Sequence, residues 1–211
     1  MRTALAERTI SELEFVFIDT ETTGFSPRAG GELVELAGVR TRDGVVLDRF
    51  QRLIRPTRPI PQHVTRIHGI TNAMVAGAPP AGEVLDEFLH FAADAIWVFH
   101  NARFDLAFII AAAQAAGLTL PDTAIIDTLT MSRKLYPNLR HALVALAERF
   151  GVDQPEAHRA LCDAETTWQL FTIFVRDNWT AAPPTFAAIG EFAWFGTLAD
   201  TVQAAANRTE V

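Results

Sequence analysis

The sequence predicts an α/β fold: a mixed sheet, with a three-strand antiparallel meander beside parallel strands and helices packed on it. The meander is predicted because three strand-like segments follow one another with short turns. Parallel pairing is predicted in the second half, where short apolar strands alternate with helical segments. The 211 residues are 49% hydrophobic and 20% charged, a composition that is ample for a packed core.

The first half supplies the meander. Apolar residues from Phe15 lead into a Thr/Gly turn at Gly24, and the next segment alternates between two faces. Asp43-Gly44 is a dipeptide typical of hairpin turns, so the third strand returns directly. The first expected strand runs from Phe15 toward the turn at Gly24. The others expected in this half are strands at 32–42 and 45–54, a helical turn at 71–75 and an amphipathic helix at 81–93.

The second half alternates strands with helices. Gly117 closes one predicted helix as a C-cap, and Asp127 ends the strand that follows. The expected elements are strands at 95–99 and 124–126, and helices at 103–116, 141–150 and 160–177. We expect these elements and the meander to form one domain over residues 1–178.

Residues 179–211 differ in composition. Ala181 to Pro184 is typical of a linker, and apolar residues then recur every three to four positions from Ile189 to Val202. This spacing predicts one amphipathic helix. Two alternatives follow for this C-terminal tail: the helix folds back on its own domain, or it docks on another protein surface, such as a second copy; the resemblance described below adds a polymerase subunit as a possible partner.

Charge and cysteine content limit the setting of the protein. Cys162 is the single cysteine, so an internal disulfide is excluded and a reducing, cytoplasmic location is predicted. The apolar runs contain charges or are too short to span a bilayer, and we expect no membrane partner. The net charge of −7 argues against nucleic-acid binding at first sight. If the acids surround bound cations, however, the net charge is a poor guide to nucleic-acid binding, because the cations invert the local electric field.

Two carboxylates interrupt the end of the first strand. Asp19 and Glu21 are two residues apart, so in an extended chain their side chains leave the same face. Side by side they repel, and a hard divalent cation is the usual compensation. A surface strand end with two solvated acids is the alternative. Asp105 and Asp163 stand near predicted helix starts, where a dipole-compensating or solvated acid is also common.

Together the four carboxylates could hold two cations about 3.5–4 Å apart, the arrangement that clamps both oxygens of a phosphodiester displacement. Oxygen-only ligands favour Mg²⁺. His158 lies five residues before Asp163, so one continuous helix would separate the two side chains. If both serve one site, His158 must lie on the loop before the helix, as Pro155 suggests. A capping or partly exposed histidine is the alternative.

Three segments carry a family resemblance: Asp19 to Gly24 (DTETTG), His100 to Asp105 (HNARFD) and His158 to Asp163 (HRALCD). They resemble, in order, the three exonuclease motifs of the DEDD superfamily. The histidine five residues before the last aspartate marks the DEDDh branch, which includes the proofreading epsilon subunit of bacterial DNA polymerase III. The segments 67–71 (IHGIT) and 126–129 (IDTL) are also similar to that branch. The resemblance covers residues 14–177 and implies a ribonuclease H-like fold.

The resemblance also implies roles. Asp19, Glu21 and Asp163 would ligate one Mg²⁺, and Asp19 would bridge to a second that Asp105 reaches directly or through water. Mn²⁺ would substitute. His158 would be the general base that deprotonates the attacking water. Residues similar to the family's contacts with the terminal nucleotide are Thr22, Thr23, Gly24, His68, Asn101 and Phe104, although a core role for Phe104 is equally consistent with its position.

The function expected from the resemblance is a metal-dependent 3′–5′ exonuclease that releases nucleoside 5′-monophosphates from single-stranded DNA, for example as a proofreading subunit. Two alternatives remain at this point. An RNA-trimming exoribonuclease has similar motifs, and the 2′-hydroxyl contacts that separate the two sugars cannot be assigned from sequence. A non-catalytic interaction module on the same fold is the other, although all four acids and the histidine are present.

Overall fold

A computed structural model describes residues 2–206 and contains one six-stranded mixed sheet in the order β3-β2-β1-β4-β5-β6. The pairs β3–β2 and β2–β1 are antiparallel, β1–β4 and β4–β5 are parallel, and β5–β6 is antiparallel. The predicted mixed sheet is confirmed. The strands are β1 (Glu14–Thr22), β2 (Leu33–Arg42), β3 (Val45–Leu53), β4 (Ile96–Phe99), β5 (Ala124–Asp127) and β6 (Trp194–Thr197).

The central strands are apolar because helices cover both faces of the sheet. In β2 every residue from Leu33 to Val39 is buried, including Gly38. A Cβ at Gly38 would lie 3.0 Å from the rings of both Phe88 and Phe91, so glycine lets a helix approach the strand closely here. Register then places Glu35 of β2 opposite Glu21 of β1.

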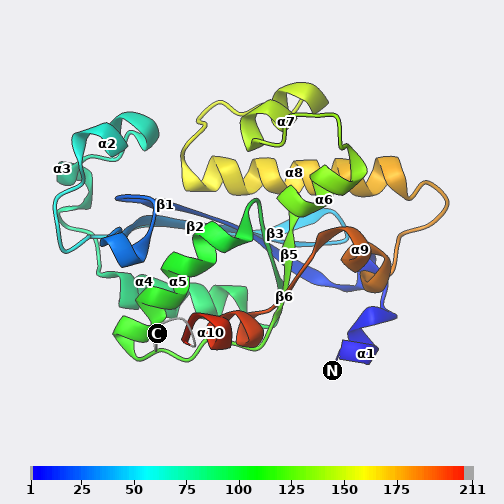
Figure 1. Cartoon of the computed structure of the whole chain (residues 1–211), viewed down its shortest axis with the longest axis horizontal. Coiled ribbons are helices and arrows are strands. Elements are labelled where there is room, and N and C mark those ends of the chain that lie inside the picture. The colour runs from blue at the N-terminus through cyan, green and yellow to red at the C-terminus, as the bar shows by residue number, and fades with distance from the viewer. Residues whose placement is uncertain (1, 207–211) are drawn as a thin grey trace.

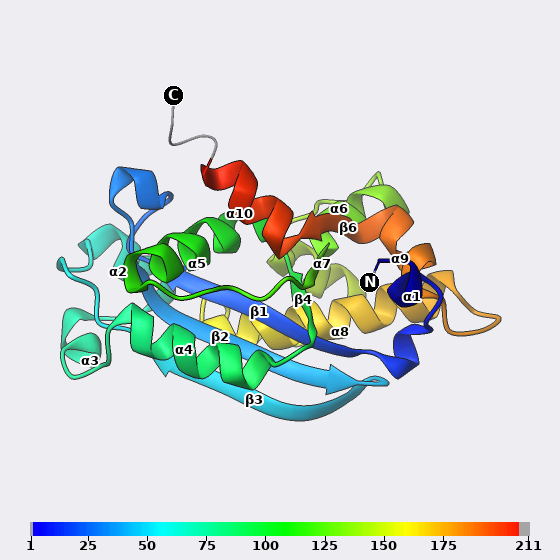
Figure 2. The same cartoon turned by 90° about the horizontal axis from the view of Figure 1, so that it is seen from below.

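Two layers of helices enclose the sheet, as Figures 1 and 2 show from perpendicular directions. On one face α4 (Ala81–Ala92), α5 (Ala102–Ala116) and α10 (Leu198–Ala206) pack around Trp97. On the other, α6 (Thr128–Leu135), α7 (Leu143–Phe150), α8 (Ala160–Asn178) and α9 (Phe186–Ala193) pack around Phe17. None of the helices in the described part of the chain has both the length and the apolar character needed to cross a membrane.

Shorter helical segments lie outside these layers. They are α1 (Arg2–Ala6), η1 (Ile10–Glu12), η2 (Pro27–Ala29), α2 (Gln62–His68) and α3 (Asn72–Val75). The sequence did not predict α2 or α6. The helix α2 is only seven residues long and starts directly after Pro61. In α6 the residues are largely polar, and its start depends on the Asp127 side chain, which accepts the Leu129 N–H at 3.0 Å.

The prediction of one helix from Ile189 to Val202 is wrong. Two helices flank the strand β6, which pairs with β5. Trp194 leaves helical geometry with φ −62° and ψ 124°, and Gly196 within β6 has a φ of +146°. The Thr197 hydroxyl then accepts the Asp200 N–H at 3.1 Å to start α10. Ile189, Ala193 and Leu198 are fully buried. The tail therefore folds back on its own domain, the first of the two alternatives; residues 207–211 of the predicted tail lie outside the described residues.

Candidate active site

Three predicted acids meet at one end of the sheet. Asp19 and Glu21 lie on β1, and Asp163 lies in the first turn of α8, which crosses β1 and β2. One carboxylate oxygen from each side chain is within 4.8 Å of the other two. In Figure 1 this is the end at which β1 points toward α2 and α8 begins. Residues 144 positions apart in the sequence are thus brought together by the packing of α8 on the sheet.

Asp105 lies beside this cluster. It belongs to the first turn of α5 and is 3% exposed, with Oδ1 accepting the Thr20 hydroxyl at 2.7 Å. It is not a member of the three-carboxylate group, but its charge is the largest charge effect on the pKa of Asp19. The strands β1 and β4 are parallel, so the chain segments that follow both of them meet at the same edge.

Burial and mutual repulsion disfavour the ionised forms of the clustered acids, and a bound cation would compensate their charge. Burial, followed by the charges of Asp105, Asp163 and Glu21, raises the pKa of Asp19 well above its ordinary value. Burial is also the largest cause at Glu21, whose pKa rises to about 9, and at Asp105, whose pKa rises to about 7. With a pKa of about 9, Glu21 keeps its proton at neutral pH when no cation is bound. An all-oxygen donor set of this kind fits a hard divalent cation.

His158 lies on the loop before α8, as its spacing from Asp163 predicted. Its side chain is exposed, and its backbone has a φ of +64°. Left-handed geometry is uncommon for a residue other than glycine, and it marks a position that its surroundings hold in place. The histidine lowers the pKa of Asp163, against the larger upward effect of burial, so the two groups belong to one electrostatic site.

The last residue of β1 and the loop that follows contain three of the predicted substrate contacts, Thr22, Thr23 and Gly24. The Thr22 hydroxyl donates to the Gly24 carbonyl at 2.7 Å, and the Thr23 hydroxyl accepts the Glu32 N–H at 2.9 Å. A Cβ at Gly24 would meet only the Gly31 Cα, at 3.8 Å, so the fold itself does not require glycine there. This loop presents its backbone next to Glu21.

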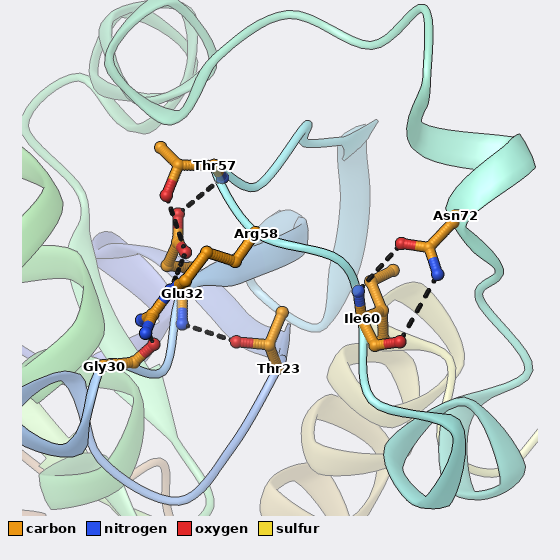
Figure 3. Close-up of polar contacts among 7 residues, drawn as sticks. All are labelled: Thr23, Gly30, Glu32, Thr57, Arg58, Ile60 and Asn72. Carbon is orange, nitrogen blue, oxygen red and sulfur yellow. Dashed lines mark hydrogen bonds and ion pairs between the residues drawn. The ribbon is translucent and has the colours of Figure 1, made fainter.

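Glu32 ties this loop to the segment that follows β3, as Figure 3 shows. Its carboxylate accepts the Thr57 N–H at 2.7 Å and the Thr57 hydroxyl at 2.9 Å, and it forms an ion pair with Arg58 at 3.4 Å. Further along, the Asn72 side chain accepts the Ile60 N–H at 2.8 Å. These contacts connect the loop after β1 to α3 without using any of the clustered acids.

The other predicted contacts occupy distinct environments. His68 ends α2; it is buried, and its Nδ1 accepts the Ile70 N–H at 2.9 Å. Asn101 precedes α5 in a left-handed conformation with φ +78°, and its side chain is exposed. Its own N–H donates to Asp127 at 2.9 Å. Phe104 is partly buried and packs on the core at 5.2 Å from the Phe108 ring, so the core role left open by the sequence is supported.

The sequence did not single out three residues of this region. Gln154 donates to the Asp163 carboxylate at 2.6 Å. Phe25, which directly follows Gly24 of the first motif, is 86% exposed. Glu35 is fully buried opposite Glu21. Glu35 carried a signal that could have been used, since it shares a predicted strand face with Leu33 and other apolar residues; Gln154 carried none.

Comparison with known proteins agrees with this geometry. The family model described as Exonuclease (RNase_T) matches residues 16–171. The chain is 40% identical over 165 residues to a DNA polymerase III PolC-type of Halalkalibacterium halodurans, covering 78% of this chain and 11% of that protein. It is 42% identical over 173 residues to a DNA polymerase III subunit epsilon-like protein of Rhodobacter capsulatus, covering 80% and 24%. The chain thus spans a small part of these relatives.

Solved structures show the same fold. Exonuclease X, solved with 5′-overhanging duplex DNA, has a TM-score of 0.65 and 30% identity, covering 83% of this chain and 98% of that one. Exonuclease I gives a TM-score of 0.71 at 18% identity, over 80% and 42% of the two chains. The nuclease domain of 3′hExo, described as a DEDDh family member, gives 0.69 at 19%, over 78% and 92%. At those identities the last two show the fold alone.

The predicted family resemblance and the ribonuclease H-like fold are therefore confirmed. Exonucleases of this family depend on divalent metal ions, and the carboxylates of Asp19, Glu21 and Asp163 are grouped as such ions require. The match over residues 16–171 includes all three motifs and every clustered acid. This chain belongs to the RNase_T exonuclease family.

Proposed function

We propose that this exonuclease hydrolyses phosphodiester bonds one at a time from the 3′ end of single-stranded DNA and releases nucleoside 5′-monophosphates. The observation that carries the proposal is the group formed by Asp19, Glu21 and Asp163, within 4.8 Å of one another at the edge where Asp105 and His158 also lie. A docking module would gain nothing from acids held together against their mutual repulsion.

Two Mg²⁺ ions suit this donor set, with Mn²⁺ as a substitute. Asp19, Glu21 and Asp163 would hold one ion, and Asp19 and Asp105 the other. When bound, the cations stabilise the negative charge that develops on the phosphodiester during displacement. The Thr20 hydroxyl holds the Asp105 carboxylate in place, and Gln154 does the same for Asp163. The acids are thereby oriented before any cation arrives.

His158 acts as the general base in this proposal. Its ring is exposed on a loop beside Asp163, so it can reach a water molecule on the solvent side of a bound phosphate. The neutral imidazole accepts one proton from that water and releases it to solvent afterwards. Protonation of the imidazole in acid removes this capacity, so the rate falls as pH decreases.

The loop after β1 and Asn101 surround the place where a terminal nucleotide would lie. Thr22, Thr23 and Gly24 offer backbone groups next to Glu21, and His68 lies in the adjoining α2. Phe25 offers an exposed aromatic face, and single-stranded nucleic acids bind such faces by base stacking. DNA is proposed as the substrate because the relatives described above are named as DNA polymerase III proteins.

Because those relatives are named as DNA polymerase III proteins, the proposed role is a proofreading activity that works with a polymerase. The single cysteine supports the proposal of a cytoplasmic location. In the PolC-type protein the matching segment is 11% of the chain, which shows that this exonuclease unit can be joined to other parts. The partner of the present chain is accordingly proposed to be a replicative polymerase.

Digestion of labelled oligonucleotides tests the proposal. A single-stranded DNA labelled at its 5′ end should give a ladder of shortening products in Mg²⁺, and none in EDTA. Matched RNA should be degraded more slowly. Asp19→Asn, which keeps the shape of the side chain, should abolish activity while the fold remains. Release of label from the 5′ end first, or full activity of Asp19→Asn, would contradict the mechanism, and faster RNA digestion would contradict the substrate.

A further inference from the structure

Glu35 is a buried carboxylate at the back of the site. It lies on β2, has no exposed surface, and faces Glu21 across the β1–β2 pair. A buried charge is costly unless hydrogen bonds and an opposite charge compensate it. Burial raises the pKa of Glu35, but hydrogen bonds from Arg159, Ala160 and Gln51 outweigh burial and lower it overall. The side chain is thus an ionised carboxylate.

Both oxygens of Glu35 are engaged, chiefly by the start of α8. Oε1 accepts from Arg159 Nη2 at 2.7 Å and from Gln51 Nε2 at 2.8 Å. Oε2 accepts from Arg159 Nε at 3.2 Å and from the Ala160 backbone N–H at 3.0 Å. Glu35 is also not a member of the three-carboxylate group identified among the described residues. Its contacts are those of a clamp on the helix start, because three of the four come from Arg159 and Ala160.

The helix α8 needs such a clamp. Its N-cap residue is Arg159, whose side chain makes no capping hydrogen bond. The first helical N–H, from Ala160, is instead satisfied by the Glu35 carboxylate from another strand. A negative charge at this end also complements the helix dipole. The Arg159 carbonyl in turn accepts the Asp163 N–H at 3.0 Å. The residue held by Glu35 is therefore hydrogen-bonded to a proposed metal ligand.

The same contacts act on His158. This residue has a φ of +64°, in a region that L-residues rarely adopt, and it immediately precedes the two residues held by Glu35. Such a conformation persists where neighbouring contacts determine it. A guanidinium fixed by two hydrogen bonds to one carboxylate leaves little rotational freedom at Arg159. Glu35 therefore restrains the residue that directly follows His158.

We propose that Glu35 is a positioning residue for the exonuclease reaction: its carboxylate fixes the start of α8 and thereby sets where His158 and Asp163 lie. The inference rests on the proposed function for the roles of those two residues. Glu35 itself touches neither the reacting phosphate nor, in this proposal, the cations.

Glu35→Gln tests the clamp at nearly constant volume. The glutamine keeps one accepting oxygen, but its NH₂ group replaces the other oxygen and would face N–H donors that it cannot accept from. In the metal-free protein we expect hydrogen exchange at the Ala160 amide to become at least about tenfold faster. With Mg²⁺ we expect kcat to fall by about 10- to 100-fold, part of the loss typical of a removed general base, with KM for single-stranded DNA changed by less than about twofold. Gln51→Met is the matched control, because it removes the one Glu35 contact that does not involve α8. It should leave exchange at Ala160 and kcat close to wild type.

Combination with His158→Asn separates positioning from general support of the fold. If Glu35 acts through His158, Glu35→Gln should cost much less kcat in the His158→Asn background than in the wild type. Fully additive losses, or a Glu35→Gln protein with wild-type kcat and wild-type exchange at Ala160, would overturn the inference. If Glu35→Gln does not fold, Arg159→Gln tests the same contact from the partly exposed side. The same changes in exchange at Ala160 and in kcat are then expected. A wild-type protein without 3′–5′ activity would defeat the proposed function instead, and the exchange measurement would still report on the clamp.

Discussion

Removal of one clustered carboxyl group should stabilise the metal-free protein. Burial, followed by the charges of Asp163, Glu35 and Asp105, raises the pKa of Glu21 from 4.5 to about 9. Between these values the unfolded chain has lost a proton that the folded protein keeps, so the free energy of unfolding falls as pH rises. Stability from this group is fully present below about pH 4.5 and is lost progressively up to about pH 9. Glu21→Gln removes the titration, and with it the loss.

The size of the effect follows from the pKa. At about pH 7.5, roughly three pH units above 4.5, each unit contributes about 1.4 kcal/mol, so Glu21→Gln should gain at most about 4 kcal/mol. For a domain of this size that corresponds to a rise in Tm of at most about 8–16 °C. It is an upper limit, because Glu21 is partly exposed and solvent screens its charge.

Thermal unfolding in EDTA, followed by circular dichroism at several pH values, measures this gain. The difference in Tm between Glu21→Gln and wild type should shrink toward zero near pH 4.5, and Mg²⁺ should reverse its sign at neutral pH because the wild type binds the cation better. Asp94→Asn, at an exposed turn before β4, controls for loss of an acid elsewhere. A Tm of Glu21→Gln equal to or below wild type in EDTA at neutral pH would refute the reasoning.

Three further predictions concern the base, the substrate and the tail. His158→Asn removes the imidazole but keeps a residue that tolerates a left-handed backbone; kcat should fall about a hundredfold to ten-thousandfold and the acid limb of the pH–rate profile should disappear, whereas an unchanged profile would exclude His158 as the base. Phe25→Ala should raise KM for single-stranded DNA by about 5- to 150-fold, since one stacked base is worth about 1–3 kcal/mol, while Tm stays constant; an unchanged KM would rule out stacking there. Leu198→Ala should destabilise the protein by about 2–5 kcal/mol in urea unfolding, and truncation at Pro183 should be far more harmful because β6 is lost from the sheet; a truncated chain as stable as the full one would show that the tail is dispensable.

Local pattern was sufficient for much of this fold. Alternation in residues 32–42, the Asp43-Gly44 turn and the apolar strands 95–99 and 124–126 predicted five strands to within about two residues. These features depend on neighbours in the chain, so they are visible in one dimension. The four acids were also predictable, since the motifs place them at the end of β1 and in the first turns of α5 and α8. Each acid alone could equally be a solvated surface residue. Only the three motifs taken together exclude that alternative.

The sequence by itself thus determined the family and five of the six described strands, and it predicted the four acids and His158 as site residues. Tertiary structure alone decided the rest, because those features are contacts between distant segments. The pairing of β6 with β5 joins residues 194–197 to residues 124–126. The periodicity of the tail cannot predict this pairing, because it depends on the unpaired edge that β5 offers in the folded domain. Glu35 contacts Arg159 from 124 positions away, so a lone acid in an apolar strand becomes a helix clamp only when α8 lies across β2. Burial and strand register exist only in the folded protein. They give this carboxylate its contacts with α8 and therefore its proposed role in positioning the site.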